Sequence, residues 1–455
     1  MISLSALSTF HRPPDRLCLL LACLLLACSQ PEPRTDVESE PAESEAAGSP
    51  QSAVAPDAET AAPASRGIWV LAEGSFRVLD DPARIPILLD RAEVLGVTDL
   101  FVQVYRGGRA FYPIEFGGAA IESVRDAEAV EPDAFALLLE AAHARDLRVH
   151  AWVNVLSLST RRDARLVSEL GRSAILVDRL GRSILDYPEL EVPEPDRSYY
   201  RMGTRGIYLD PALPEVRKRL VATFREMVAR YPGLDGLHLD YIRHPGVLPF
   251  TPGSRFGVGL DFGYGEASRA HYVTETGQAD PIAGLAPGRV RGADRWDAWR
   301  REKVTTLVEE IGEAIRAVQP GIILSAAVIA YVDRAYLTLA QDWRSWLESG
   351  AIDLAMPMVY TLDDRLLRYQ VENYAGWPVA ERIWPGVGVW LLEDDPMRAL
   401  GQLEHVRNAG LPGEMYFSDD AIAEAPALLA ALAASRPDSP EPEPEPEPEP
   451  TPAAP

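Results

Sequence analysis

The chain has 455 residues, 47% of them hydrophobic, and a formal net charge of −24 at pH 7. This length allows one large folded domain with appendages, and the acidic balance argues against a nucleic-acid-binding protein, which needs a basic surface. All three cysteines lie within the first 28 residues, so the remaining chain can contain no disulfide, thiol nucleophile or thiolate metal site.

Residues 1–28 predict the signal peptide of a lipoprotein. Two arginines precede the apolar run 17–27, which is too short to span a membrane as a helix. The run ends in Leu-Leu-Ala-Cys, which resembles a bacterial lipobox with Cys28 as the lipidated residue. We therefore expect a cell-envelope protein that is lipid-anchored to the membrane. Ser29 favours the outer membrane, facing the periplasm, over the inner membrane. A plain secretory signal is the alternative.

The segments that flank the central part of the chain are expected to be disordered. Residues 29–66 form an acidic tether rich in Pro, Ala, Ser and Glu, and residues 436–455 form a tail built on a Pro-Glu repeat. Neither segment has enough apolar side chains to offset the entropy of an ordered chain. The folded domain is therefore expected to span residues 67–435.

Strand-like and helix-like segments alternate through this domain. The expected strands are 68–73, 99–105, 148–155, 236–242, 322–329, 352–360, 386–391 and 414–418. The expected helices are 81–96, 132–146, 214–230, 295–318, 335–349, 364–374, 396–409 and 421–434. Eight such pairs predict an α/β fold, a (β/α)8 TIM barrel. A doubly wound open sheet is the alternative, but no G-x-G-x-x-G loop follows the first strand.

Two connections, 156–213 and 244–294, are too long to be plain loops. They follow the third and fourth strands, at the end of the barrel where enzymes of this fold place their substrate cleft. Both insertions are rich in aromatic residues, which could pack against the apolar faces of sugars or simply against each other.

The fourth strand and its exit carry the most informative stretch, L-D-G-L-H-L-D-Y-I-R-H-P at residues 234–245. Leucines alternate with His238 and Asp240, and this period of two predicts a strand with two unlike faces. The leucines would face the outer helices, so His238 and Asp240 would point into the barrel. Asp240, at the carboxyl end of the strand, is the first candidate for a catalytic residue.

Neighbouring strands add polar groups by the same parity. The third strand would direct His150, Trp152 and Asn154 inward, and the second Gln103 and Tyr105. His150 and His238 could equally be core polar groups satisfied by hydrogen bonds, although a cluster from three successive strands favours a site.

Other candidates lie near the ends of strands. Glu73 closes the first strand and Glu393 follows the seventh, while Tyr360 and Trp390 would line the mouth of the barrel. Asp235 and Asp353 open their strands and are expected to be structural. The sequence contains neither H-x-H nor H-E-x-x-H, so we expect no metal and no cofactor. Two carboxylates that act on a glycosidic bond need none.

Several motifs resemble the glycosyl-hydrolase-like family 10. They are R-G-I-W-V at 66–70, H-A-W-V-N at 150–154, Y-L-D-P…P-E-V-R at 208–217, D-G-L-H-L-D-Y-I-R-H-P at 235–245 and W-R-R-E-K-V at 299–304. The resemblance implies a barrel glycosidase of the bacterial envelope that acts on peptidoglycan glycan strands. The fourth strand also resembles, more distantly, the D-G-x-D-x-D-x-E motif of family 18 chitinases, with Ile242 in place of the glutamate that would be the acid.

The resulting hypothesis is a glycoside hydrolase of a bacterial polysaccharide. Asp240 would be the nucleophile or charge stabiliser, and Glu73 or Glu393 the acid. Substrate would be held by residues of the barrel mouth, namely Gln103, Tyr105, His150, Trp152, Asn154, His238, Tyr241, Arg243, Tyr360 and Trp390. The missing strand-four glutamate favours a second hypothesis, a catalytically silent glycan-binding lipoprotein. A metal-dependent deacetylase is a third.

Overall fold

The computed structural model describes residues 65–114, 122–124, 132–179, 181–183, 206–246, 259–287 and 289–435. The expected signal peptide with Cys28, the tether up to residue 64 and the tail from residue 436 lie outside the described residues. The first strand begins at Ser65, so the last two residues assigned to the tether belong to the folded domain.

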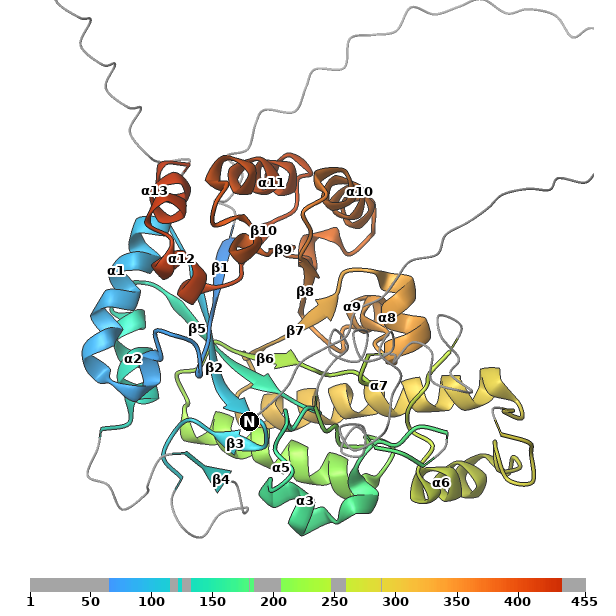
Figure 1. Cartoon of the computed structure of the whole chain (residues 1–455). Helices are drawn as coiled ribbons and strands as arrows, with labels where there is room; N and C mark the ends of the chain where they lie inside the picture. Colours follow the sequence, from blue (N-terminus) through green and yellow to red (C-terminus); the bar gives the residue numbers. More distant parts are fainter. Residues whose placement is uncertain are drawn as a thin grey trace, which may run out of the picture. The chain divides into compact units, whose positions relative to one another are not determined.

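Eight parallel strands form a closed barrel (Figure 1). In order around the barrel they are β1 (Ser65–Val70), β2 (Asp99–Arg106), β5 (Arg148–Asn154), β6 (Gly236–Asp240), β7 (Ile323–Ile329), β8 (Leu354–Val359), β9 (Gly386–Val387) and β10 (Gly413–Tyr416). Strand β1 pairs with both β10 and β2, which closes the ring. The predicted TIM barrel is therefore confirmed, and an open sheet is excluded.

Helices follow the strands around the outside of the barrel (Figure 1). They are α1 (Ile85–Leu95), α2 (Ala134–His143), α5 (Pro214–Arg230), α7 (Ala293–Val318), α8 (Val332–Leu339), α9 (Trp343–Ser349), α10 (Asp364–Ala375), α11 (Pro396–Asn408), α12 (Asp419–Glu424) and α13 (Pro426–Ala434). Local chemistry sets several boundaries. Asp133 accepts hydrogen bonds from the first N–H groups of α2, and Gly96 ends α1 in a left-handed conformation.

Several expected elements differ from the structure. The helix expected at 335–349 is two helices, because Ala340 adopts a φ of 55° between α8 and α9. The last helix is also divided, since Pro426 begins a new helix where its ring cannot continue the old one. The strand expected at 386–391 pairs only through Gly386–Val387 and continues as the 3-10 helix η6 (Val389–Leu392). A short apolar run in the sequence is compatible with either a strand or a helix.

Large side chains and glycines share the interior of the barrel. Trp69, Phe101, Trp152 and Trp384 belong to one buried cluster between the strands. A Cβ atom on Gly386 would lie 2.7 Å from the Trp69 ring. Glycine at inward positions therefore makes room for large neighbours, and the barrel is a packed core rather than a pore.

The amino-terminal end of the barrel is stabilised by carboxylates that join neighbouring strands. Asp235 accepts a hydrogen bond from the Val149 N–H at 2.7 Å and pairs with His143. Asp353 does the same for the Leu324 N–H at 2.8 Å. Both aspartates thus occupy the structural positions expected from the sequence, away from the end that carries the site.

The long connections contain additional elements. The first leads through α3 (Arg165–Leu170), and the second contains α6 (Glu266–Thr276). In the second connection, Tyr264 and Tyr272 pack against Trp296 of α7, and Tyr272 also packs against Trp299. Among the described residues, none of the helices combines the length with the hydropathy that a membrane-spanning helix needs.

Candidate active site

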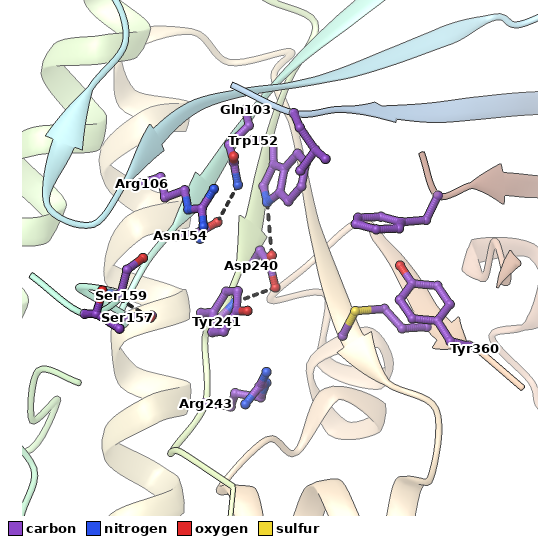
Figure 2. Close-up of a pocket in the computed structure, with 14 residues that line it drawn as sticks. Gln103, Arg106, Trp152, Asn154, Ser157, Ser159, Asp240, Tyr241, Arg243 and Tyr360 are labelled. Carbon is purple, nitrogen blue, oxygen red and sulfur yellow. Dashed lines mark hydrogen bonds between the residues drawn. The ribbon is translucent and has the colours of Figure 1, made fainter. Parts of the chain in front are cut away.

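A pocket of about 460 Å³ opens at the carboxyl ends of the barrel strands (Figure 2). Its lining residues are Leu71, Gln103, Arg106, Trp152, Asn154, Ser157, Ser159, Thr160, Asp240, Tyr241, Arg243, Met358, Tyr360 and Phe417. They come from strands β2, β5, β6 and β8 and from the segments that follow β1, β5, β6, β8 and β10. The volume is typical of a site for a small ligand.

Asp240 lies in this pocket with both carboxylate oxygens engaged (Figure 2). The Trp152 indole N–H donates to Oδ2 at 3.1 Å, and the Tyr241 backbone N–H donates to Oδ1 at 2.7 Å. Asn154, at the carboxyl end of β5, lies opposite Asp240 in the register of the two parallel strands. The carboxylate is therefore held in one orientation by its neighbours before any ligand arrives.

Burial and charge act in opposite directions on Asp240. Burial raises the pKa of this carboxyl, and the hydrogen bonds together with the charges of Arg243 and Arg106 oppose the rise. The pKa stays above its ordinary value, because desolvation is the largest effect. A carboxyl group with a raised pKa inside a pocket is a feature typical of functional sites.

Tyr241 enters the pocket through an unusual backbone conformation. Strand β6 ends at Asp240, and Tyr241 adopts a φ of 52°, in the left-handed region that side chains rarely occupy. The turn brings its ring under Arg243, whose guanidinium carbon lies 4.9 Å from the ring centroid. Strand parity alone would have placed Tyr241 among the outward leucines.

Arg243 is a buried cation among the residues that line the pocket. Its side chain is 7% exposed, and Nε has no hydrogen-bond partner among the described residues. Within that part of the chain, no carboxylate lies within ion-pair distance of it, although the charge of Asp240 acts on it through space. Arg243 can therefore supply a hydrogen-bond donor and a positive charge to a ligand.

The opposite wall offers amides and hydroxyl groups. Gln103 Nε2 donates to Asn154 Oδ1 at 3.2 Å, and Ser157 and Ser159 follow at the exit of β5 (Figure 2). Such groups exchange hydrogen bonds with hydroxyl groups in either direction. Trp152 supplies an apolar ring beside them.

The structure corrects the prediction for Tyr105. The pairing of β2 with β5 shifts by one residue between Gln103 and Tyr105, as in a β-bulge. Tyr105 consequently points outward and packs edge-on against Phe224 of α5, with ring centroids 5.4 Å apart. The same shift turns Arg106 into the pocket, where the sequence did not predict it.

Neither proposed acid lines the pocket. Glu73 is exposed and forms ion pairs with Arg106 at 3.3 Å and Arg109 at 3.2 Å. It therefore touches the site only through Arg106. Glu393 is exposed at the end of η6. Among the described lining residues, Asp240 is the only carboxylate.

His150 and His238 lie deeper in the barrel than the pocket. His238 stands two residues before Asp240, about 6.6 Å along an extended strand. The Trp69 indole donates to His238 Nε2 at 3.0 Å, so the neutral ring carries its proton on Nδ1 and donates to Ser325 at 2.9 Å. Burial, and then the nearby His150, lower the pKa of His238 well below its ordinary value. His150 stacks on Phe101 and bonds to Asp99 at 2.9 Å.

The two histidines thus fit the alternative that the sequence left open, polar groups engaged inside the core. Trp390 also stands outside the lining of the pocket, on η6. The structure gathers the remaining candidates in one place, namely Gln103, Trp152, Asn154, Asp240, Tyr241, Arg243 and Tyr360.

Seven lining residues were not predicted: Leu71, Arg106, Ser157, Ser159, Thr160, Met358 and Phe417. Parity could have identified Met358, which shares a face of its strand with Tyr360. The serines and Thr160 belong to a connection without periodicity, so their orientation depends on tertiary contacts. Among the described residues, no group of three His, Cys, Asp or Glu side chains is placed to hold a metal ion.

The sequence is similar to those of known proteins. The sequence model of the glycosyl hydrolase-like 10 family matches residues 64–383. Glycosyl hydrolase DigH of Escherichia coli (strain K12) is 24% identical over 429 residues, covering 84% of this chain and 83% of the relative. Glycosyl hydrolase YngK of Bacillus subtilis (strain 168) is 26% identical over 292 residues, covering 60% of this chain and 48% of the relative.

The fold recurs in solved structures. The glycoside hydrolase domain of PgaB (BpsB) from Bordetella bronchiseptica aligns with a TM-score of 0.58 and 15% identity, covering 81% of this chain and 98% of that domain. At this identity the likeness concerns the fold. The matched family spans β1 to β8 with the pocket's principal strands, and it confirms the prediction of a glycoside hydrolase. The chain belongs to the glycosyl hydrolase-like 10 family.

Proposed function

We propose that this protein hydrolyses glycosidic bonds in the glycan strands of peptidoglycan, with Asp240 as the charged group at the reacting sugar. One observation carries the proposal. A buried carboxylate, oriented by two hydrogen bonds, lies at the carboxyl end of a barrel strand in a pocket with aromatic and amide walls. The names of the relatives, glycosyl hydrolases, support the class of reaction.

The chemistry follows from where charge develops. Cleavage of a glycosidic bond passes through an oxocarbenium-like transition state, which a nearby negative charge stabilises. Trp152 and the Tyr241 N–H hold the carboxylate of Asp240 in place, so little reorganisation is needed during the reaction. Tyr360 and Phe417, whose ring centroids are 5.4 Å apart, offer apolar surface to the CH face of a sugar.

The central test is Asp240→Asn, assayed as release of reducing ends from purified peptidoglycan glycan strands. The substitution keeps the shape of the side chain and removes its charge. Turnover should fall at least roughly a hundredfold, the scale expected when one electrostatic stabiliser is lost. Unchanged turnover in a variant with a normal thermal midpoint would place the chemistry at another residue.

Glu73→Gln and Glu393→Gln, measured beside it, test the two proposed acids. The variant that lacks the acid should lose least on substrates with good leaving groups, because these need little protonation. Glu348→Gln is the matched control, since Glu348 is an exposed carboxylate on α9 that pairs with Arg344. Equal turnover in both variants and the wild type would remove both residues from the mechanism.

One observation favours a second function, a glycan-binding protein without turnover. The described residues that line the pocket include a single carboxylate, whereas most glycosidases act with a pair. Ile242, which stands where family 18 chitinases carry the acid, is fully buried and apolar. Saturable binding of glycan strands without release of reducing ends would establish this function instead.

We also propose that the protein is anchored by a lipid at Cys28 in the bacterial cell envelope, on the periplasmic face of the outer membrane. The support is the sequence at residues 17–29, with its apolar run, lipobox-like end and Ser29. Such an anchor would place the barrel beside the peptidoglycan layer. The long acidic segment between Cys28 and β1 would allow the barrel to reach it.

A further inference from the structure

Trp390 lies next to the pocket but is not used by the proposed reaction. All nine tryptophans lie in the described part of the chain, and Trp390 is the exposed one, at 45%. A large aromatic side chain in contact with water loses the free energy that burial would supply. Its position beside Tyr360, a residue of the pocket, makes it a candidate for contact with a ligand.

Backbone hydrogen bonds connect Trp390 to the wall of the pocket. The Trp390 N–H donates to the carbonyl oxygen of Phe417 at 3.4 Å, and the Phe417 N–H donates to the carbonyl oxygen of Val387 at 3.1 Å. Phe417 lines the pocket. The segment that carries Trp390 is thus held at the same end of the barrel as Asp240, on the side of β9 and β10.

Gly388 brings the Trp390 indole close to Tyr360, another lining residue. A Cβ on Gly388 would lie 3.1 Å from the Tyr360 ring and 3.2 Å from Trp390 Nε1. Both side chains therefore border the same small volume over the glycine. Among the described residues the indole N–H of Trp390 has no acceptor, so it can donate to a ligand.

We propose that Trp390 forms an outer sugar-binding subsite that continues the Tyr360 and Phe417 wall beyond the pocket. Its occupant is a further sugar of the glycan strand whose bond is cleaved beside Asp240. The indole ring packs on the apolar CH face of that sugar, and its N–H donates to a hydroxyl group. This inference rests on the proposed function and adds that the protein recognises a polymer over several units.

The test compares Trp390→Ala, Trp390→Phe and wild type on peptidoglycan-derived oligosaccharides separated by length. For wild type, kcat/KM should rise with length until the outer subsite is filled. In Trp390→Ala, kcat/KM should rise less with length, so that its deficit relative to wild type grows to about tenfold on the longest oligomers. In Trp390→Phe, which keeps an aromatic ring, kcat/KM should stay close to the wild-type value at every length. Tyr369→Ala is the matched control, since Tyr369 is an exposed aromatic residue, 69% accessible, on the outer helix α10.

Two results would overturn the subsite. One is a loss in Trp390→Ala of the same size at every length, which a structural role would produce. The other is a length dependence identical to wild type. Calorimetric binding of the same oligosaccharides separates this inference from the proposed function: binding that weakens with Trp390→Ala on long oligomers, without turnover in wild type, supports the subsite and refutes the hydrolase. A wild type that binds none of the oligosaccharides refutes both.

Discussion

Asp240 and Arg243 are buried in the same pocket, and each changes the electrostatic environment of the other. The charge of Arg243 lowers the pKa of Asp240, against the larger rise that burial causes. No carboxylate of the described residues forms an ion pair with Arg243, and the through-space attraction to Asp240 offsets part of the desolvation cost of its guanidinium group. The pKa of Asp240 therefore depends on two opposing effects, its burial away from water and its attraction to Arg243.

This balance predicts a shift in the pH dependence of activity. Arg243→Gln removes a positive charge that lowers the pKa of Asp240, so this pKa should rise further. The limb of the kcat/KM profile that reports Asp240 should move to higher pH. It is the acid limb if the residue acts ionised, and the basic limb if it acts as the proton donor. Arg344→Gln, at the surface on α9, is the control. If the pH profile of kcat/KM in Arg243→Gln matched that of wild type, the charge of Arg243 would have no effect on the titration of Asp240.

Strand register decides which side chains reach the pocket. In β6 the alternation runs without interruption, so Asp240 points inward. In β2 one shift in pairing sends Tyr105 outward and Arg106 inward. Glycine at an inward position of a strand leaves space for a large side chain of the neighbouring strand. Gly236 leaves this space for the ring of His150. A single residue can therefore determine which side chains of a strand face the pocket and how closely two strands pack.

Gly236→Ala should therefore destabilise the barrel. The new Cβ would lie 2.1 Å from His150 Nδ1 and 2.9 Å from the Ile323 carbonyl oxygen, and His150 cannot move because it stacks on Phe101. We expect a loss of about 1–3 kcal/mol in the free energy of unfolding, measured with urea. Gly321→Ala is the matched control, because no atom lies within 4 Å of its Cβ position. Equal stability of the two variants would contradict this account of the interior.

Buried neutral histidines make the stability of the whole molecule depend on pH. Burial, followed by the charges of Arg300 and Arg301, lowers the pKa of His244 from 6.5 to about 3. Between these values the unfolded chain binds a proton that the folded protein does not. Stability from this residue is therefore complete above pH 6.5 and is lost as the pH falls toward 3.

His244→Phe should remove that dependence, because phenylalanine fills a similar volume and does not titrate. Nδ1 of His244 has no partner among the described residues, so little is lost by replacing it. The slope of the unfolding free energy against pH, between pH 5 and pH 6, should decrease by up to about 1.4 kcal/mol per unit. Urea unfolding at several pH values measures it. A slope as steep as that of wild type would show that His244 titrates normally.

The proposed anchor is tested on the full-length protein in cells. Cys28→Ser removes the thiol that would be lipidated, so the protein should leave the membrane fraction, whereas Cys23→Ser should not release it. Fractionation with an antibody against the barrel measures both. If wild type and Cys28→Ser are found in the same fraction, residues 1–28 have another function.

The amino-acid sequence by itself determined the barrel and the inward direction of Asp240. These features follow from local geometry, since the period of two in a strand and the caps of helices such as α2 and α10 depend on neighbours in the chain. The same alternation predicted Trp152 and Asn154, which the structure brings to the pocket.

Only the tertiary structure decided how deep each inward side chain lies and what it meets there. His150 and His238 share the inward face with Asp240, yet they bond within the core, because their strand positions lie below the mouth. The bulge in β2 and the left-handed turn at Tyr241 depend on pairing and packing with distant segments. Glu73 and Glu393 lie after the ends of their strands, where no periodicity operates, so contacts with Arg106 and exposure to solvent determined their positions.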